Sequence, residues 1–260
     1  MRFDFSNLRP DWFVGSVAAS NIITAAQLLF PAGERYFVRS VQRFQSRFVH
    51  DERMRADIRG FIGQEGTHAA QVEELLAALD SLGYKTKPFC EALDRSVLRP
   101  LEARFPAELN LAITAALEHY TAITARLMMQ MPQLDEAHPG FVRLIRWHAL
   151  EELEHKAVAF DVMERVCPSY AYRVAGMFFA TTLMAAGWFA SFAMLSKQRG
   201  QSLPDAFLEI RRVREERAID AKIVTDVFLS GIAEYLLPGF HPNNTSDQQM
   251  LERGLRELEL

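Results

Sequence analysis

A ten-residue stretch, Trp147 to Lys156, carries three side chains that could bind a metal ion. Glu152 and His155 are three residues apart, and His148 lies four residues before Glu152. In a helix, offsets of three, four and seven place all three side chains on one face. A carboxylate and two imidazoles on one face offer the oxygen and nitrogen donors that bind borderline divalent metals. This stretch is therefore a candidate metal site.

A second glutamate and histidine pair with the same spacing, Glu65 and His68, occurs earlier in the chain, with Glu34 and Glu118 as further candidates. The four elements fall on four different expected helices. Dinuclear carboxylate bundles have this ligand pattern: two helices each supply one Glu, and the other two helices each supply a Glu-x-x-His motif. The sequence thus predicts a dinuclear centre whose candidate ligands are Glu34, Glu65, His68, Glu118, His148, Glu152 and His155.

The expected roles of these ligands differ. Glu65 and Glu152 would bridge two metal ions, and the other two glutamates would each bind one ion. His68 and His155 would supply one nitrogen to each metal. His148 could bind the same metal as His155, or it could instead be a hydrogen-bonding partner outside the ligand set. Four side chains could orient the imidazoles or be ordinary surface groups: Gln64, Glu151, Glu154 and Asp161.

Apolar periodicity predicts an all-α fold, in which Pro31–Gly33 breaks the chain just before Glu34. Further helices are expected at about 52–81, 88–104, after Pro106, and at about 139–166, 219–236 and 247–259. We expect one ferritin-like four-helix domain over 1–260, with additional N- and C-terminal helices. Its metal-binding bundle would span about 32–166, and its apolar and C-terminal helices about 170–258.

The helix expected at 52–81 has Glu65 and His68 within its apolar stripe. Burying an ionised carboxylate without a partner is very unfavourable, so a metal is the economical partner. Gly63 and Gly66 weaken this helix and hint that another group approaches its backbone. His119 is rotated by about 100° from Glu118, which favours a hydrogen-bonded packing role for this histidine.

Residues 174–195 contain no charged side chain, and this segment is long enough to span a bilayer. Three alternatives remain for this segment: burial in the bundle or at a subunit contact of a homodimer, shallow membrane association, and true spanning. Burial or shallow association is favoured, because no other segment has the length and apolarity of a membrane span.

The net charge of −4 gives no support for nucleic-acid binding, which requires a basic face. Cys90 and Cys167 occur in no metal-binding spacing, and a reduced cytoplasmic location is expected. The first residues show no basic segment followed by an apolar run, so no signal peptide is expected.

Four segments of the chain resemble a bacterial family described as predicted metal-dependent hydrolases. They are Phe30–Phe37, Phe61–His68, Leu117–Ala122 and Trp147–Asp161, and the resemblance covers about residues 12–240. The family name implies hydrolysis, whereas its motifs imply a ferritin-like centre. Many members have a further histidine one turn after the first Glu-x-x-His, where this chain has Val72. The His-x-x-x-Glu-x-x-His spacing is also similar to that of ferritin-like di-iron arylamine N-oxygenases, which have an added histidine ligand.

Two enzymatic functions follow from this pattern. The favoured one is an oxygenase or oxidase that uses iron and O₂ on a hydrophobic or aromatic small molecule, within a site lined by apolar side chains. The candidate lining residues are Phe37, Phe61, Ile62, Ile113 and Ile145. The alternative is a hydrolase with a two-metal-activated water. Manganese or an iron–manganese pair could replace iron, and zinc is less expected. Iron storage or peroxide detoxification is a non-enzymatic or protective alternative.

Overall fold

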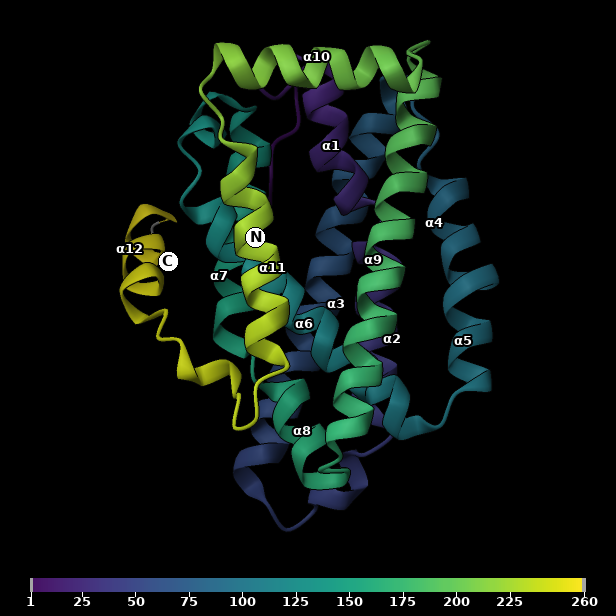
Figure 1. The fold of residues 1–260 in the computed structure, drawn as a ribbon, viewed down its shortest axis with the longest axis vertical. Helices are drawn as coiled ribbons and strands as arrows, with labels where there is room; N and C mark the ends of the chain where they lie inside the picture. The colour runs from purple at the N-terminus through teal and green to yellow at the C-terminus, as the bar shows by residue number, and fades with distance from the viewer. Residues whose placement is uncertain (1, 259–260) are drawn as a thin grey trace.

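The computed structural model describes residues 2–258, and all of the regular secondary structure within them is helical. The long helices run side by side along the molecule, and α10 crosses one end (Figure 1). The α-helices are α1 (Val17–Gln27), α2 (Phe30–Gln42), α3 (Glu52–Ser81), α4 (Lys87–Leu93), α5 (Arg99–Arg104), α6 (Ala107–Met129), α7 (Pro139–His155), α8 (Val158–Val166), α9 (Tyr170–Gln198), α10 (Leu203–Glu216), α11 (Ala221–Tyr235) and α12 (Gln248–Leu258). The all-α prediction is confirmed.

Most helix boundaries follow local sequence signals. Asp51 accepts a hydrogen bond from the Met54 amide at 2.9 Å and caps α3. Ser16, Ser169 and Ser202 cap α1, α9 and α10 in the same manner. The helix expected at 88–104 is present, but a π-helical turn at Asp94–Leu98 separates α4 from α5.

Two predicted helix boundaries are wrong. Pro31 does not break the chain, because α2 begins at Phe30 and a proline in the first helical turn needs no amide partner. The helix expected at 139–166 is interrupted after His155, and α8 begins at Val158. The Lys156 side chain at this interruption is hydrogen bonded to the Thr245 carbonyl and the Asp247 carboxylate.

Four helices pack in a closed cycle that surrounds a common interior. Helix α2 packs on α3, α3 on α7, α7 on α6, and α6 on α2. These four helices carry all seven candidate ligands. The cycle is the geometry that the ligand pattern requires, and the ferritin-like assignment of the whole fold stays a prediction.

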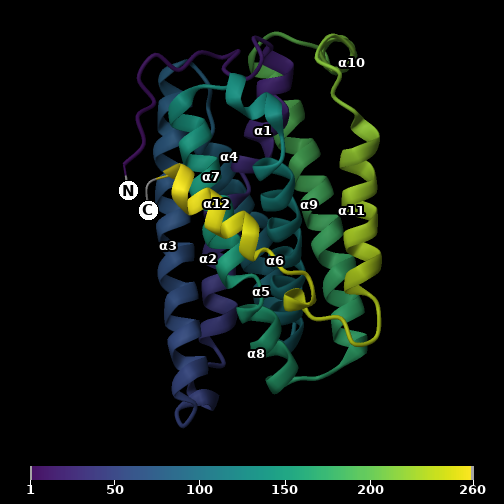
Figure 2. The same ribbon diagram turned by 90° about the vertical axis from the view of Figure 1, so that its left-hand side faces the viewer.

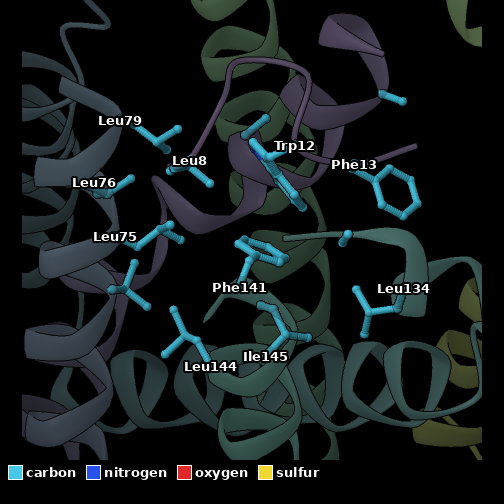
Figure 3. Close-up of a cluster of buried hydrophobic side chains, with 14 of the residues drawn as sticks. Leu8, Trp12, Phe13, Leu75, Leu76, Leu79, Leu134, Phe141, Leu144 and Ile145 are labelled. Atoms are coloured by element: carbon cyan, nitrogen blue, oxygen red, sulfur yellow. The ribbon is translucent and has the colours of Figure 1, made fainter. Parts of the chain in front are cut away.

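Two apolar clusters lie along the bundle, and α3 contributes to both. Met54, Ile58 and Phe61 belong to one cluster, whereas Leu75 and Leu79 belong to the other. Figure 3 shows part of the second cluster, where the Trp12 ring lies against Phe141 with centroids 3.8 Å apart. Glu65 and His68 lie on α3 between the residues of the two clusters. The bundle therefore has apolar packing on both sides of the candidate site.

Helix α9 lies outside the four-helix cycle, with one face on α6 and α1. Among the described residues it is the one helix long and apolar enough to cross a membrane, and 22% of its most apolar window is buried. Phe178 and Phe189 on its other face are exposed. Complete burial of this helix within the chain was one of the alternatives, and the structure contradicts it.

Residues 241–258, which we call the C-terminal strap, return across the bundle and end in α12 against α7 (Figure 2). Asp247 accepts hydrogen bonds from Arg126 of α6 and from Lys156, which follows α7. Gly254 of the strap fits closely on the bundle, because an added Cβ would lie 2.5 Å from Leu150 Cδ2. The strap thus fastens the chain end over the α6–α7 seam.

Candidate metal centre

All seven candidate ligands lie in the interior of the four-helix cycle. No side chain among them is more than 4% exposed. The set is Glu34 from α2, Glu65 and His68 from α3, Glu118 from α6, and His148, Glu152 and His155 from α7. Residues from four separate helices therefore converge in one buried cluster, as the spacing of the sequence motifs predicts.

The ligand atoms form two groups, in each of which they lie within 4.8 Å of one another. The nitrogen-rich group is Glu34, His68 and His148, and the oxygen-rich group is Glu65, Glu118, Glu152 and His155. The sequence left open whether His148 shares a metal with His155, and the geometry instead groups His148 with Glu34 and His68. Seven residues of helix correspond to about 10 Å along the axis, so the two histidines lie at different ends of the cluster.

Two glutamates reach both groups. Glu152 Oε1 lies 2.9 Å from His148 Nε2 and 3.4 Å from His68 Nδ1, whereas its Oε2 lies 3.7 Å from His155 Nε2. Glu65 Oε1 lies 2.9 Å from His155 Nε2 and 3.9 Å from His68 Nδ1. A carboxylate placed between two groups of donors can bridge two cations. These are the two residues for which the sequence predicts a bridging role.

The other two glutamates each lie at one end of the cluster. Glu34 Oε1 is 3.5 Å from His148 Nε2, and Glu118 Oε2 is 3.5 Å from His155 Nε2. Each contacts a histidine of its own group, which is the arrangement expected of terminal ligands.

Three of the four candidate orienting residues contact the histidines directly or through a neighbour. His68 Nε2 lies 3.0 Å from Glu151 Oε2, and His155 Nδ1 lies 3.1 Å from Gln64 Oε1. The Gln64 amide nitrogen in turn donates to Glu154 Oε2 at 3.2 Å. Such contacts fix the orientation of an imidazole and direct its other nitrogen inward.

Asp161, the fourth candidate, does not contact the centre. It lies on α8, beyond the helix interruption, and accepts a hydrogen bond from His241 Nε2 at 2.7 Å. His119 Nε2 donates to the Gly231 carbonyl at 2.8 Å and belongs to the packing between α6 and α11. The predicted packing role of His119 is confirmed.

Aromatic rings surround the histidines. Phe61 lies edge-on to His155, with ring centroids 5.1 Å apart, as part of the predicted apolar lining. Phe30 and Trp147 were not predicted, yet their rings lie 4.9 Å from His148 and 5.1 Å from His68. Both are the first residues of segments that carry the family resemblance, and this position was the available signal. Of the other predicted lining residues, Phe37, Ile113 and Ile145 are buried and Ile62 is half-buried.

The carboxyl groups have unusual acidities because they share a buried space. Burial and repulsion from neighbouring carboxylates raise the pKa of Glu34 and raise that of Glu118 to about 8. Burial also raises the pKa of Glu65. Burial acts in the same direction on Glu152, but hydrogen bonds from three imidazoles outweigh it and hold its pKa well below the usual value. Glu152 is therefore the carboxylate that stays ionised most readily.

The three histidines also differ in acidity. Burial opposes the charged form of His68, but the hydrogen bond to Glu151 and the nearby Glu152 carboxylate outweigh it and raise the pKa of His68 to about 10. Burial, reinforced by the neighbouring His68, lowers the pKa of His148 to about 4. Burial also opposes the charged form of His155, but the neighbouring carboxylates of Glu118, Glu152 and Glu65 outweigh it and raise its pKa. Metal binding would displace protons from these groups.

The cluster contains many buried polar atoms without a hydrogen-bond partner. Nine such atoms belong to six of the seven candidate ligands: both oxygens of Glu34, Glu65 and Glu118, Oε2 of Glu152, Nδ1 of His68 and Nε2 of His155. An unsatisfied buried polar group is costly, and buried charges in proteins are paired or coordinate metals. Two divalent cations would satisfy these atoms and neutralise four carboxylates. The residues present therefore fit a dinuclear metal centre.

The searches of curated proteins and of solved structures find no match. A family described as predicted metal-dependent hydrolase matches residues 1–246, which include every candidate ligand and the beginning of the strap. The geometry of the buried cluster agrees with the metal dependence in this description. The chain belongs to the family of predicted metal-dependent hydrolases.

Proposed function

We propose that the chain is an oxidoreductase that holds two iron ions in the buried cluster and uses O₂ to oxidise a hydrophobic small molecule. The observation that carries this proposal is the complete burial of four carboxylates and three imidazoles among apolar and aromatic side chains. Bound iron would supply an O₂-binding position and would carry to O₂ the electrons that the substrate gives up.

The protein residues support this chemistry by keeping water out. Phe30, Phe61 and Trp147 lie against the imidazoles, so a reactive species at the centre would meet apolar groups rather than solvent. O₂ is small and apolar and can cross such surroundings more readily than a polar substrate can. The mixture of carboxylate oxygens and imidazole nitrogens suits iron or manganese, whereas structural zinc sites use four nitrogen or sulfur donors.

Hydrolysis of an ester or amide is the second candidate function, and the family description favours it. The bridging positions of Glu65 and Glu152 would hold two metals close together, as a metal-activated water requires. A hydrolase would also need a path by which water and a polar substrate reach the centre. Two surface pockets, one beside Arg211, Arg214 and Ala218 and the other beside Arg126, Met131 and Val227, have no candidate ligand among their lining residues.

The two functions can be separated by loading one preparation with different metals. Metal-free protein is supplied anaerobically with two equivalents of Fe(II), and oxygen consumption is measured with an electrode after O₂ is admitted. We expect rapid uptake coupled to oxidation of the bound Fe(II). In Glu152→Gln, which loses a bridging carboxylate, uptake should fall to the rate of free Fe(II). Glu73→Gln, at an exposed ion pair with Arg35, is the matched control and should behave as the parent.

A second portion of the same preparation is loaded with Zn(II) or Mn(II) and assayed against aromatic and aliphatic esters. Ester cleavage that Glu152→Gln abolishes, together with no O₂ uptake by the Fe(II) form, would replace the oxidative function by the hydrolytic one.

A further inference from the structure

We propose that the two halves of the centre bind metal ions with unequal affinity, that the nitrogen-rich group fills first, and that Glu151 is the positioning residue that sets this order. The inference rests on the dinuclear centre of the proposed function, but it does not depend on the reaction catalysed there.

The first argument is the difference in donor atoms. The nitrogen-rich group has two imidazoles, His68 and His148, whereas the oxygen-rich group has one, His155. Imidazole suits iron, cobalt and zinc, and carboxylate suits manganese and magnesium. A borderline divalent ion should therefore prefer the nitrogen-rich group. A harder ion should be retained better by the oxygen-rich group.

The second argument is the difference in the groups that hold the two motif histidines. His68 and His155 occupy equivalent positions in their Glu-x-x-His motifs, so the motifs alone give two equal halves. His68 Nε2 contacts the Glu151 carboxylate at 3.0 Å, whereas His155 Nδ1 contacts the neutral Gln64 amide oxygen at 3.1 Å. A carboxylate that accepts a hydrogen bond from a ligating imidazole makes its other nitrogen a stronger donor. A neutral amide does so less.

The third argument is that the inward nitrogen of His68 is available for a ligand. His68 Nδ1 is completely buried, faces Glu152 Oε1 at 3.4 Å and has no hydrogen-bond partner. The contact with Glu151 holds the opposite side of the ring, so this orientation is fixed by the protein. Glu151 itself is partly exposed, at 23% of its side chain, and can be replaced without creating a buried cavity.

The test is an anaerobic titration of metal-free protein with Co(II), followed by calorimetry and by visible absorption. The protein is expected to bind two equivalents in two resolved steps whose affinities differ by about tenfold or more. In Glu151→Gln, the first step should weaken by roughly 10–100-fold while the second step stays unchanged. In Gln64→Leu, the second step should weaken and the first should not, which widens the gap between them.

Two further variants keep the result interpretable. His148→Ala removes one imidazole from the nitrogen-rich group and should bring the two affinities together. Glu73→Gln, at the exposed pair with Arg35, should titrate as the parent does. Circular dichroism of each metal-free variant checks that the helices are intact. When one equivalent each of Co(II) and Mn(II) is supplied, Co(II) should fill the nitrogen-rich group and Mn(II) the oxygen-rich group, as measured by elemental analysis and electron paramagnetic resonance.

A single binding step with equal affinities would overturn the inference, as would Glu151→Gln weakening both steps equally or neither. Failure to bind Co(II) at all would instead overturn the metal centre itself. Unequal steps without O₂ uptake by the Fe(II) form would keep this inference and reject the oxidative function, so the outcomes are distinguishable.

Discussion

The interior of the α2–α3–α7–α6 cycle and the outer face of α9 depart from the usual distribution of side chains in opposite directions. The interior buries four carboxylates and three imidazoles, with at most 4% of any side chain exposed. The outer face of α9 exposes Phe178 at 65% and Phe189 at 49%, and the helix has no charged residue between Arg173 and Lys197. One region places charge where apolar groups belong, and the other places apolar groups in contact with solvent.

The two regions differ in how closely their structure specifies the ligand or partner that would contact them. In the interior, the distances, the unpaired atoms and the charge of named residues all suit cations, so the kind of ligand that fits there can be specified. On the outer face of α9, no geometry specifies a partner, because apolar contact is not directional. A buried polar cluster therefore defines its ligand far more closely than an exposed apolar face defines what covers it.

Removing the bound metal should lower the stability of the fold more than the substitutions below, because it leaves the buried charges unpaired. A ligand present at 1,000 times its dissociation constant stabilises the native state by about 4 kcal/mol per site. For a chain of this size, each site would then correspond to a fall of roughly 8–16 °C in Tm on chelation. Differential scanning calorimetry of metal-loaded and chelator-treated protein measures this change. Equal Tm values would show that the interior is stable without cations.

Substituting one phenylalanine on each face of α9 compares how much the two faces contribute to stability. Phe192 is completely buried, so Phe192→Ala should reduce the free energy of unfolding by about 3–5 kcal/mol. Phe189→Ala, on the exposed face, should change it by less than about 0.5 kcal/mol in the monomer. Urea denaturation at low protein concentration gives both values. A large loss for Phe189→Ala that grows with protein concentration would show that another copy of the chain covers this face.

Asp247 belongs to a second buried cluster of charges, in which the side chains of Arg126 and Lys156 balance its carboxylate without a metal ion. Asp247→Asn leaves Arg126 and Lys156 without their carboxylate and should cost about 3 kcal/mol of unfolding free energy. Glu215→Gln, which breaks an exposed pair with Arg211, is the matched control and should cost less than about 0.5 kcal/mol. Chemical denaturation of both variants at neutral pH measures the difference, and equal losses would contradict the importance of burial.

The same pair predicts a pH dependence with a definite sign. Burial opposes ionisation of Asp247, but hydrogen bonds from Arg126 and Lys156 outweigh it and lower its pKa. A carboxyl group with a lowered pKa in the folded state stabilises the fold above the unfolded-state pKa, near about 4. The stability difference between the parent and Asp247→Asn should therefore be complete at neutral pH and shrink as the pH falls below about 4.

Glycine substitutions should give the smallest changes in stability, and the two changes should have opposite signs. An added Cβ at Gly66 of α3 would meet no protein atom within 4 Å, so Gly66→Ala should stabilise the chain by about 1 kcal/mol. At Gly231 of α11, a Cβ would lie 2.2 Å from Ile123 Cδ1, and Gly231→Ala should destabilise by about 1–3 kcal/mol. Thermal denaturation of the metal-free proteins compares the two, and destabilisation by Gly66→Ala would indicate an unrecognised contact at α3.

The sequence predicted the candidate ligands because helical geometry converts fixed spacings into shared faces. Glu65 with His68 and Glu152 with His155 needed only their offset of three and an amphipathic background. The closed packing of four helices followed from the ligand pattern. The close approach that Gly63 and Gly66 hinted at does not come from the chain itself, because no protein atom lies within 4 Å of a Cβ placed at either residue.

Other features depend on contacts that a linear pattern does not contain. The group that His148 joins depends on the axial positions of α2 and α3 beside α7, which spacing within one helix does not give. The interruption after His155 was missed because apolar periodicity continues through it. Arg126 and Asp247 are 121 residues apart and resemble ordinary surface charges in the sequence. For α9, the uncharged composition does not determine which face is covered.

The C-terminal strap has a consequence for the order of events during synthesis. All seven candidate ligands lie between Glu34 and His155, whereas Asp247, which fastens the strap, is translated about 90 residues later. At 5–20 residues per second, a nascent chain carries its complete ligand set for roughly 5–20 s before the strap can close. A cation that enters in this interval reaches the ligands before the α6–α7 seam is covered. In the finished protein, entry through the α6–α7 seam would require the Asp247 ion pairs to open.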